Sequence, residues 1–322
     1  MRLDHNENRD HRWGVILAGG EGKRLLPLTR RIAGDDRPKQ FCRITGGETL
    51  LHQTRRRVSG MVRPQQTLLV LTKIHESFYL NQVDDVAPSC LLIQPCNRGT
   101  APAILYSLMH VSQLDRNALI AFFPSDHYFS EDAALNTHVD SAFREAQSHP
   151  RLVILLGISP ETPEVDYRWI QPGAPLDDTA AMMPVFRVAR FWEKPPQSLA
   201  YSLMALGCLW NSFIMVGRVG AFLGLFRRAL PALFRTFCRS SSVTVDRRVL
   251  NNVYSRISTV NFSHDVLSAC PALLAVMRAD GLGWSDLGTP ARVLSLVARK
   301  GIKTEVGFDL SADSILVGAA SA

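Results

Sequence analysis

Leu17-Ala18-Gly19-Gly20-Glu21-Gly22-Lys23-Arg24-Leu25-Leu26-Pro27-Leu28-Thr29 directly follows the apolar run that starts at Trp13. The apolar run predicts a buried first strand, and glycines at positions 19, 20 and 22 allow a tight turn that exposes backbone N–H groups. Such a loop binds anions. Lys23 and Arg24 add positive charge, and a guanidinium can hold two phosphate oxygens at once. The stretch therefore predicts a loop that cradles a phosphate chain.

Two better-known phosphate loops do not fit this stretch. A Walker loop has glycine where Leu17 stands and a hydroxyl residue where Arg24 stands. The dinucleotide fingerprint has a third glycine where Leu25 stands. A glycine-rich loop is also compatible with an ordinary strand-to-loop turn, so the interpretation depends on the rest of the chain.

Length and composition are typical of one α/β domain. The chain has 322 residues, and no apolar run reaches the roughly twenty residues that span a bilayer. We expect a polar N-terminal tail over residues 1–12, a catalytic domain over 13–300 and a short C-terminal tail over 301–322. Residues 1–12 do not resemble a signal peptide, so we expect a cytoplasmic protein without a membrane partner.

Charge and cysteine usage exclude two other classes. The net charge of +7 would suit nucleic acid, but the arginine groups are short, separated and without interleaved aromatics. Solvated helix faces explain the arginine groups, and an anionic small substrate suits the positive net charge as well as nucleic acid does. The six cysteines contain no Cys-x-x-Cys pair, which argues against a zinc site and a disulfide framework. They are predicted to be buried thiols.

Apolar runs alternate with helical patterns along the chain. This rhythm predicts an α/β fold with a mainly parallel central sheet flanked by helices. Strands are expected over residues 13–17, 67–72, 90–94, 118–123, 153–158, 185–190 and 273–277, and another begins at Leu209. Helices are expected from about residue 100 to 114, over 291–300, and over 219–237 with a bend near Pro231. Ligands of such sheets bind beyond the carboxyl ends of the strands.

Polar residues follow several of these strands. Lys39 stands at a predicted helix start and could reach the same anion as the glycine loop, although a surface role is the simpler explanation. Gln94 ends a strand, and its amide suits the edge of a nucleobase. Gly99 and Thr100 begin the next helix, where capping alone would also explain the threonine.

Two aspartates are candidate ligands for Mg²⁺. Asp126 directly follows the expected central strand 118–123, and Asp286 lies on the glycine-flanked loop 283–289. Mg²⁺ is typically shared between one or two carboxylates and substrate phosphates. A cap or turn role would also explain Asp126, and only a folded sheet could bring the two together. No metal-ligand spacing accompanies His127, which we interpret as structural.

Lys194 ends the strand that begins at residue 185, just ahead of a proline. It could present a charge to a second phosphate, and a surface pair with Glu193 is the alternative.

Seven motifs together resemble those of the sugar-1-phosphate nucleotidyltransferases. Their residues most resemble the mannose-1-phosphate guanylyltransferase branch of that family. They are residues 17–29, Pro38-Lys39-Gln40-Phe41, Arg98-Gly99-Thr100-Ala101-Pro102-Ala103, Pro124-Ser125-Asp126-His127, Phe191-Trp192-Glu193-Lys194-Pro195, Trp210-Asn211-Ser212 and Gly283-Trp284-Ser285-Asp286. They occur in the family's order and cover nearly the whole chain. The resemblance implies a Rossmann-like nucleotidyltransferase fold and transfer from GTP to mannose 1-phosphate, with release of pyrophosphate.

The resemblance also implies roles for individual residues. Catalytic roles fall to Arg24, Lys39 and Asp126, and Mg²⁺ would be held by Asp126 and Asp286. The nucleotide-binding residues would be Leu17, Gly19, Gly20, Gly22, Gln94, Gly99 and Thr100. The sugar phosphate would be bound by Glu193, Lys194 and Asn211. Both substrates are anions that repel each other, so positioning and charge stabilisation suit the chemistry better than a side-chain nucleophile.

Departures from the family pattern leave the substrates open. Gln94 stands where many guanylyl members have Glu, and its amide fits uracil or thymine as well as guanine. The family's Gly-Tyr-Gly-Tyr segment reads Asp166-Tyr167-Arg168-Trp169, and Phe213 replaces the glycine of Asn-Ser-Gly. UTP or dTTP, another sugar 1-phosphate, and a sensor that binds sugar nucleotides without turnover are the alternatives.

Overall fold

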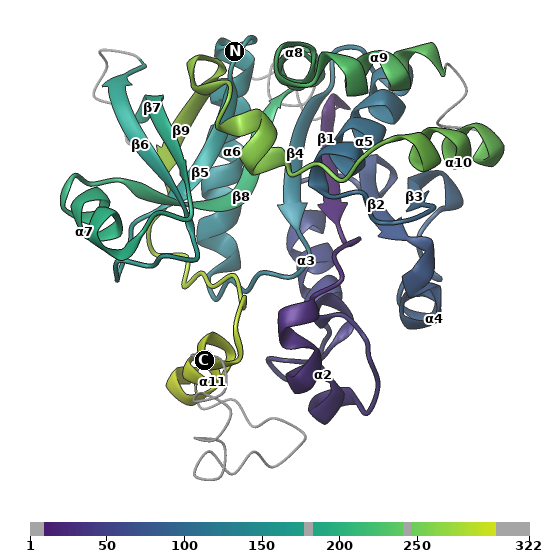
Figure 1. The fold of residues 1–322 in the computed structure, drawn as a ribbon, viewed down its shortest axis with the longest axis horizontal. Helices are drawn as coiled ribbons and strands as arrows, with labels where there is room; N and C mark the ends of the chain where they lie inside the picture. Colours follow the sequence, from purple (N-terminus) through teal and green to yellow (C-terminus); the bar gives the residue numbers. More distant parts are fainter. Residues whose placement is uncertain (1–9, 177–182, 241–245, 301–322) are drawn as a thin grey trace.

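The computed structural model describes residues 10–176, 183–240 and 246–300. Its centre is a nine-stranded sheet in the order β3-β2-β1-β4-β8-β5-β9-β7-β6 (Figure 1). The strands are β1 Arg12–Leu17, β2 Thr67–Thr72, β3 Leu91–Gln94, β4 Leu119–Pro124, β5 Val153–Ile158, β6 Arg168–Pro175, β7 Val185–Glu193, β8 Leu209–Arg218 and β9 Leu274–Arg278. All the predicted strands are present, and most of them start or end within a few residues of the predicted position.

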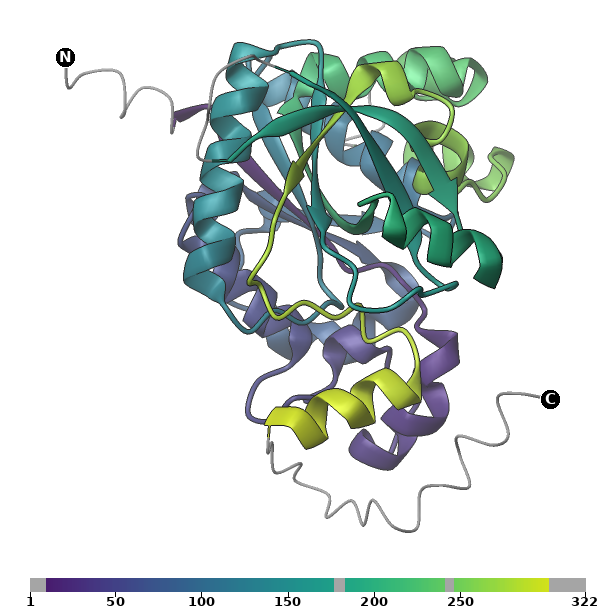
Figure 2. The ribbon, with the colours of Figure 1, turned by 90° about the vertical axis from the view of Figure 1, so that its left-hand side faces the viewer.

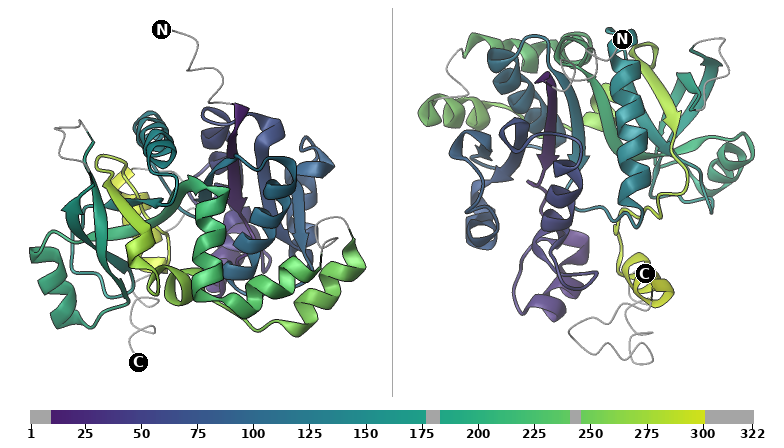
Figure 3. Two further views of the ribbon diagram at one scale, coloured as in Figure 1. Left: turned by 90° about the horizontal axis from the view of Figure 1, so that it is seen from above. Right: turned by 180° about the vertical axis from the view of Figure 1, so that it is seen from behind.

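The helices between the strands are α2 Leu26–Ala33, α3 Leu50–Ser59, α4 Glu76–Tyr79, α5 Thr100–Leu114, α6 Asp132–Ser148, α7 Gln197–Ala205, α8 Val219–Ala229, α9 Pro231–Arg239, α10 Arg247–Arg256 and α11 Pro290–Lys300. Helices α5, α8, α9 and α10 cover one face of the sheet, and α3 and α6 cover the other (Figure 3). The α/β class is therefore confirmed.

Alternating burial along the central strands explains the two layers. In β4, Ile120 and Phe122 pack under the helices of one face, while Leu119 and Phe123 pack under those of the other. Successive side chains of a strand point to opposite faces, so a strand covered on both sides is apolar throughout. This is why the run at 118–123 carries a clear strand signal.

Strand direction departs in part from the predicted mainly parallel sheet. Strands β3, β2, β1 and β4 pair in parallel, as do β5 and β9. β8 runs antiparallel between β4 and β5, and β7 runs antiparallel to β9 and β6. Because β8 and β7 are inserted with reversed direction, the carboxyl ends of β1, β4, β5 and β9 still meet at one edge.

The predicted bent helix over residues 219–237 is wrong. The structure has two separate helices, α8 and α9, joined by Leu230 with φ −131° and ψ 58°. Proline lacks the backbone N–H that would continue a helix and disfavours helical geometry at the residue before it. Pro231 therefore starts a new helix instead of bending a continuous one.

The last described helix packs below the sheet against the segment that follows the glycine loop. Helix α11 lies beside α2 (Figure 2), and Val293, Leu296 and Val297 share a buried cluster with Leu25 and Leu28. Arg12 was predicted to belong to the N-terminal tail, but it is the first residue of β1. Its guanidinium is ion-paired with Asp140 at 2.5 Å. The remaining predicted tails fall mainly on residues 1–9 and 301–322, outside the described ranges. Within those ranges, no helix has the length and apolar character needed to cross a bilayer.

Candidate active site

The glycine loop after β1 is held by side chains that take its carbonyl groups. Gln40 is buried, and its Nε2 donates to the carbonyl oxygens of Ala18 at 3.2 Å and Gly20 at 2.7 Å. The Thr72 hydroxyl donates to the Gly19 carbonyl at 3.2 Å. Within the described residues, the N–H groups of Gly19, Gly20 and Glu21 form no hydrogen bond. Free backbone donors of this kind are what the predicted anion cradle requires.

Gly19 is required by close packing with two side chains. A Cβ at this position would lie 2.7 Å from the Thr72 hydroxyl and 2.8 Å from the Gln94 amide nitrogen. Gln94 is itself buried, and Tyr254 donates to its Oε1 at 3.1 Å. Its Nε2 donates to the Leu71 carbonyl at 3.4 Å. The Gln94 amide is therefore held in one orientation beside the loop.

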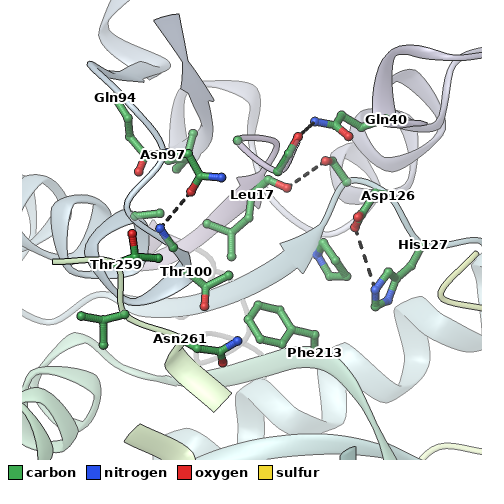
Figure 4. Close-up of a pocket in the computed structure, with 18 of the residues that line it drawn as sticks. Leu17, Gln40, Gln94, Asn97, Thr100, Asp126, His127, Phe213, Thr259 and Asn261 are labelled. Atoms are coloured by element: carbon green, nitrogen blue, oxygen red, sulfur yellow. Dashed lines mark hydrogen bonds and ion pairs between the residues drawn. The ribbon is translucent and has the colours of Figure 1, made fainter. Parts of the chain in front are cut away.

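A cavity of about 340 Å³ opens between the glycine loop, the start of α5 and the end of β4 (Figure 4). Seven residues predicted for the site line it: Leu17, Gly19, Gly20, Gln94, Gly99, Thr100 and Asp126. The other seven are outside this lining: Gly22, Arg24, Lys39, Glu193, Lys194, Asn211 and Asp286. The nucleotide-binding set is thus largely brought together, while the sugar-phosphate set is not.

The cavity wall at the start of α5 is completed by residues 259–261, a segment that the sequence analysis did not identify. Gly99 has φ +83°, and a Cβ there would lie 2.3 Å from the Val260 carbonyl oxygen. Val260 N–H donates to the Arg98 carbonyl at 3.0 Å, and Thr100 Oγ1 accepts from Phe262 N–H at 2.8 Å. Thr100 is the first residue of α5, as predicted. Residues 259–261 also line the cavity, and no local pattern marks them.

Lys39 connects the two predicted metal-binding aspartates. Its ammonium donates to the Asp286 carbonyl at 2.6 Å and lies 3.3 Å from Asp126 Oδ2. The Lys39 side chain is 9% exposed. Burial raises the pKa of Asp126, but the Lys39 charge lowers it, and the net pKa lies below the usual value. Asp126 is therefore held ionised at the edge of the cavity.

Two loops that follow distant strands are joined by backbone hydrogen bonds. Tyr128 N–H donates to the Ser285 carbonyl at 2.8 Å, and Ser285 N–H donates to the Tyr128 carbonyl at 3.0 Å. This bridge aligns the loop after β4 with the loop after β9. The segments that carry Asp126 and Asp286 therefore lie side by side in the folded chain.

The Asp286 carboxylate is fixed by three groups. Oδ1 accepts from the Tyr167 hydroxyl at 3.2 Å, from Gly288 N–H at 2.9 Å and from Arg292 at 3.1 Å. Arg292 also donates to Glu164 at 2.7 Å and lies 4.2 Å from the centre of the Tyr167 ring. Among the described residues, Oδ2 accepts only from Arg292, at 3.3 Å. This oxygen keeps an acceptor site for a cation.

His127 lies in the cavity wall as well as in the packing. The Trp284 indole N–H donates to its Nδ1 at 3.2 Å. Because an indole nitrogen only donates, Nδ1 carries the lone pair and Nε2 carries the proton. Nε2 lies 3.9 Å from Asp126 Oδ1. Burial lowers the pKa of His127, so the neutral ring presents this N–H beside Asp126.

A bulge in β8 explains the Asn-Ser pair. The register with β5 shifts between Leu155 and Gly157, and Phe213 lies in the bulge with φ +64°. Asn211 Oδ1 accepts from Phe213 N–H at 3.0 Å. The Asn211 amide nitrogen is buried without a hydrogen-bond partner among the described residues. Figure 4 shows the Phe213 ring in the cavity between Asn261 and His127.

Glu193 and Lys194 differ in their surroundings. Glu193 accepts from Arg168 Nε at 2.9 Å, and Arg168 lines the cavity. Lys194 is exposed, has φ +41° and does not line the cavity. Arg24 is 59% exposed, lies 4.0 Å from Asp166 and does not line the cavity.

Comparison with known proteins gives a consistent result. The nucleotidyl transferase family model matches residues 13–299. The alginate biosynthesis protein AlgA of Pseudomonas aeruginosa is 29% identical over 298 residues, which are 88% of this chain and 58% of AlgA. Mannose-1-phosphate guanylyltransferase of Escherichia coli is 26% identical over 293 residues, covering 85% of this chain and 58% of that enzyme. The chain thus spans less than two thirds of these relatives.

A solved structure supports the same resemblance. The Thermus thermophilus protein described as mannose-1-phosphate geranyltransferase superposes with a TM-score of 0.75 and 27% identity. The match covers 86% of this chain and 76% of that protein. The resemblance drawn from the seven motifs is confirmed by all three comparisons.

Proposed function

Because the chain belongs to the nucleotidyl transferase family, we propose that it transfers a nucleoside monophosphate to a sugar 1-phosphate, specifically from GTP to mannose 1-phosphate. An oxygen of the sugar phosphate attacks the α-phosphorus in line. The new oxygen–phosphorus bond forms as the bond to the β-phosphate bridging oxygen breaks, which gives GDP-mannose and pyrophosphate. The observation that carries the proposal is the set of free loop N–H groups beside the Lys39–Asp126 pair.

Each part of the site suits one requirement of this reaction. The free N–H groups of the glycine loop suit the binding of the triphosphate. Gly22 and Arg24 come next in the sequence, and we assign them to the same phosphate chain. Lys39 suits the neutralisation of negative charge that builds up at the reacting phosphates. The buried Asn211 amide N–H lacks a partner among the described residues, but Asn211 lies outside the cavity lining, so its assignment to the sugar phosphate rests on the family resemblance. Positioning two anions in line is the main contribution that we assign to the protein.

Mg²⁺ fits the donors that the chain offers. Asp126 faces the cavity with a partly exposed carboxylate. Asp286 lies outside the cavity lining, and its Oδ2, which accepts from Arg292 at 3.3 Å, keeps one acceptor site. Within the described residues, no three His, Cys, Asp or Glu side chains form a complete metal site. Mg²⁺ usually takes further ligands from phosphates, so two carboxylates are an appropriate set. When bound, the ion would stabilise the charge on the phosphates.

Two observations support alternatives within the same family. The Gln94 amide is fixed by Tyr254 and Leu71, and an amide suits uracil and thymine as well as guanine. Arg168 and Phe213 both line the cavity at positions where the family pattern has glycine. The alternatives are therefore UTP or dTTP as the nucleotide, and another sugar 1-phosphate. Binding without turnover is the non-enzymatic alternative.

A substrate panel tests the proposal. Purified protein with Mg²⁺ is assayed for pyrophosphate release with each of the four ribonucleoside triphosphates and dTTP, against mannose, glucose and heptose 1-phosphates. The proposal expects the highest kcat/KM for GTP with mannose 1-phosphate. Preference for UTP or dTTP would reject the guanine assignment, and binding of GDP-mannose without any turnover would favour the sensor.

A cytoplasmic location is part of the proposal, because both proposed substrates are phosphorylated metabolites. The absence of nucleic-acid and membrane partners stays a prediction.

A further inference from the structure

We propose that Arg168 binds the phosphate of the sugar 1-phosphate, in the place that the family resemblance assigns to Lys194. The inference rests on the proposed function, because it names the residue that receives the second substrate. Arg168 supplies the one Lys or Arg side chain in the cavity lining within the described residues. A cavity that receives two anions has the greatest need for a cation inside it.

The geometry of Arg168 suits a phosphate. Arg168 begins β6 and lies directly opposite Glu193 of β7 in the sheet register. Its Nε donates to Glu193 Oε2 at 2.9 Å, and the two side chains are 30% and 22% exposed. Within the described residues, the two terminal nitrogens of the guanidinium form no hydrogen bond. Two parallel N–H groups can bind two oxygens of one phosphate.

Glu193 acts as a positioning residue in this arrangement. Its carboxylate holds the Nε side of the planar guanidinium, so the opposite edge keeps a fixed direction. This use of Glu193 differs from the direct contact with sugar that the resemblance implies. Lysine at position 168 would keep the charge but would lose the paired N–H groups.

Lys194 lacks the features that favour Arg168. Its side chain is exposed, and it is absent from the cavity lining. Lys194 is therefore one residue past the end of β7, on the side of the chain that faces solvent.

Steady-state kinetics with three matched variants test the inference. Arg168→Gln is expected to raise the KM for mannose 1-phosphate by roughly 10- to 100-fold, the range for losing charged hydrogen bonds, with the KM for GTP within about twofold. Arg168→Lys should give an intermediate KM. Arg190→Gln, an exposed residue on the same strand as Glu193, should leave both KM values unchanged.

The opposite pattern would overturn the inference. It is wrong if Arg168→Gln leaves the KM for mannose 1-phosphate unchanged, or raises the KM of both substrates equally. A large increase in Lys194→Gln without one in Arg168→Gln would return the phosphate to Lys194.

Calorimetric titration separates this inference from the proposed function. Mannose 1-phosphate and glucose 1-phosphate are titrated into the wild-type protein and Arg168→Gln. Binding to the wild type that is lost in Arg168→Gln supports the inference even if no pyrophosphate is released. Equal binding to both proteins contradicts it even if the transferase reaction is observed, and no binding to the wild type together with no pyrophosphate release contradicts both the inference and the proposed function.

Discussion

Backbone strain at single residues points to the same part of the molecule as the chemistry. Among the described residues, three that are not glycine have positive φ: Lys194, Phe213 and Leu287. Phe213 lies two residues after Asn211, and Leu287 directly follows Asp286. Each such residue costs about 1 to 3 kcal/mol and persists only where the surroundings hold it. Their position beside predicted site residues supports the location of the active site.

Loss of the Asp126 or Asp286 carboxylate tests the metal assignment. Asp126→Asn and Asp286→Asn are each expected to lower kcat by roughly 100-fold or more, because one electrostatic stabiliser of the phosphates is lost. The measurement is pyrophosphate release at saturating substrates and several Mg²⁺ concentrations. Asp280→Asn, at an exposed position after β9, is the control and should keep its rate. Near-normal rates in both site variants would reject the metal assignment.

The two adjacent loop glycines are expected to differ in stability. Gly19→Ala places a methyl group 2.7 Å from Thr72 and 2.8 Å from Gln94, whereas Gly20→Ala has nothing within 4 Å. Gly19→Ala should lower the free energy of unfolding by about 1 to 3 kcal/mol, as overpacking does. Gly20→Ala should change it little. Urea unfolding measures both, and equal stability of the two variants would contradict the described loop geometry.

Helix α11 stabilises the site from a distance. Its apolar face packs with Leu25 and Leu28 at the start of the chain, and Arg292 reaches from it to Asp286 and Glu164. The Arg292 side chain, which is 15% exposed, therefore connects the last described helix to the loop that carries Asp286. A change in this helix should affect the carboxylate that we assign to the metal.

Replacement of Arg292 tests this coupling. Arg292→Gln leaves Asp286 and Glu164 without their cation, which should cost about 3 kcal/mol of unfolding free energy and lower kcat. Arg299→Gln is the matched control, because Arg299 lies on the same helix in an exposed pair with Glu161 at 3.8 Å. Thermal unfolding and pyrophosphate release measure the two effects. If both variants behave alike, α11 has no specific role in positioning Asp286.

Buried and half-buried histidines distributed over the fold predict how the stability of the protein depends on pH. Burial lowers the pKa of His75, His110 and His138. Below about pH 6.5 these histidines bind protons in the unfolded chain, whereas in the folded protein they bind protons only at lower pH. The free energy of unfolding is therefore highest above about pH 6.5 and falls as the pH drops below it.

This pH dependence is measurable by thermal unfolding. The Tm should be lower at about pH 5.5 than at about pH 7.5, by roughly 2 °C for each 1 kcal/mol lost. His110→Gln should reduce the difference. His264→Gln should not reduce it, because Asp265 raises the pKa of His264, and a raised pKa stabilises the fold at the lower pH. A Tm that is equal or higher at the lower pH would contradict the prediction.

Local sequence patterns were sufficient for most of the elements and for half of the site. Alternating and continuous apolar runs located every strand except β6, and the glycines, prolines and the threonine at position 100 located many of the ends. These signals are local, because periodicity and turn chemistry act within a few residues. Leu17, Gly19, Gly20, Gln94 and Thr100 lie on such element ends, and all of them line the cavity.

Contacts between distant segments depended on strand order and direction, which no local pattern encodes. The reversed strand β8 pairs its first residues with β5 and β6 and its later residues with β4 and β5, and the bridge from Tyr128 to Ser285 brings the segment of Asp126 to that of Asp286. Residues 259–261 and Arg292 join the site for the same reason. Local propensity therefore accounts for where each element begins and ends, and burial of both sheet faces accounts for which elements meet, because that burial involves the whole chain at once.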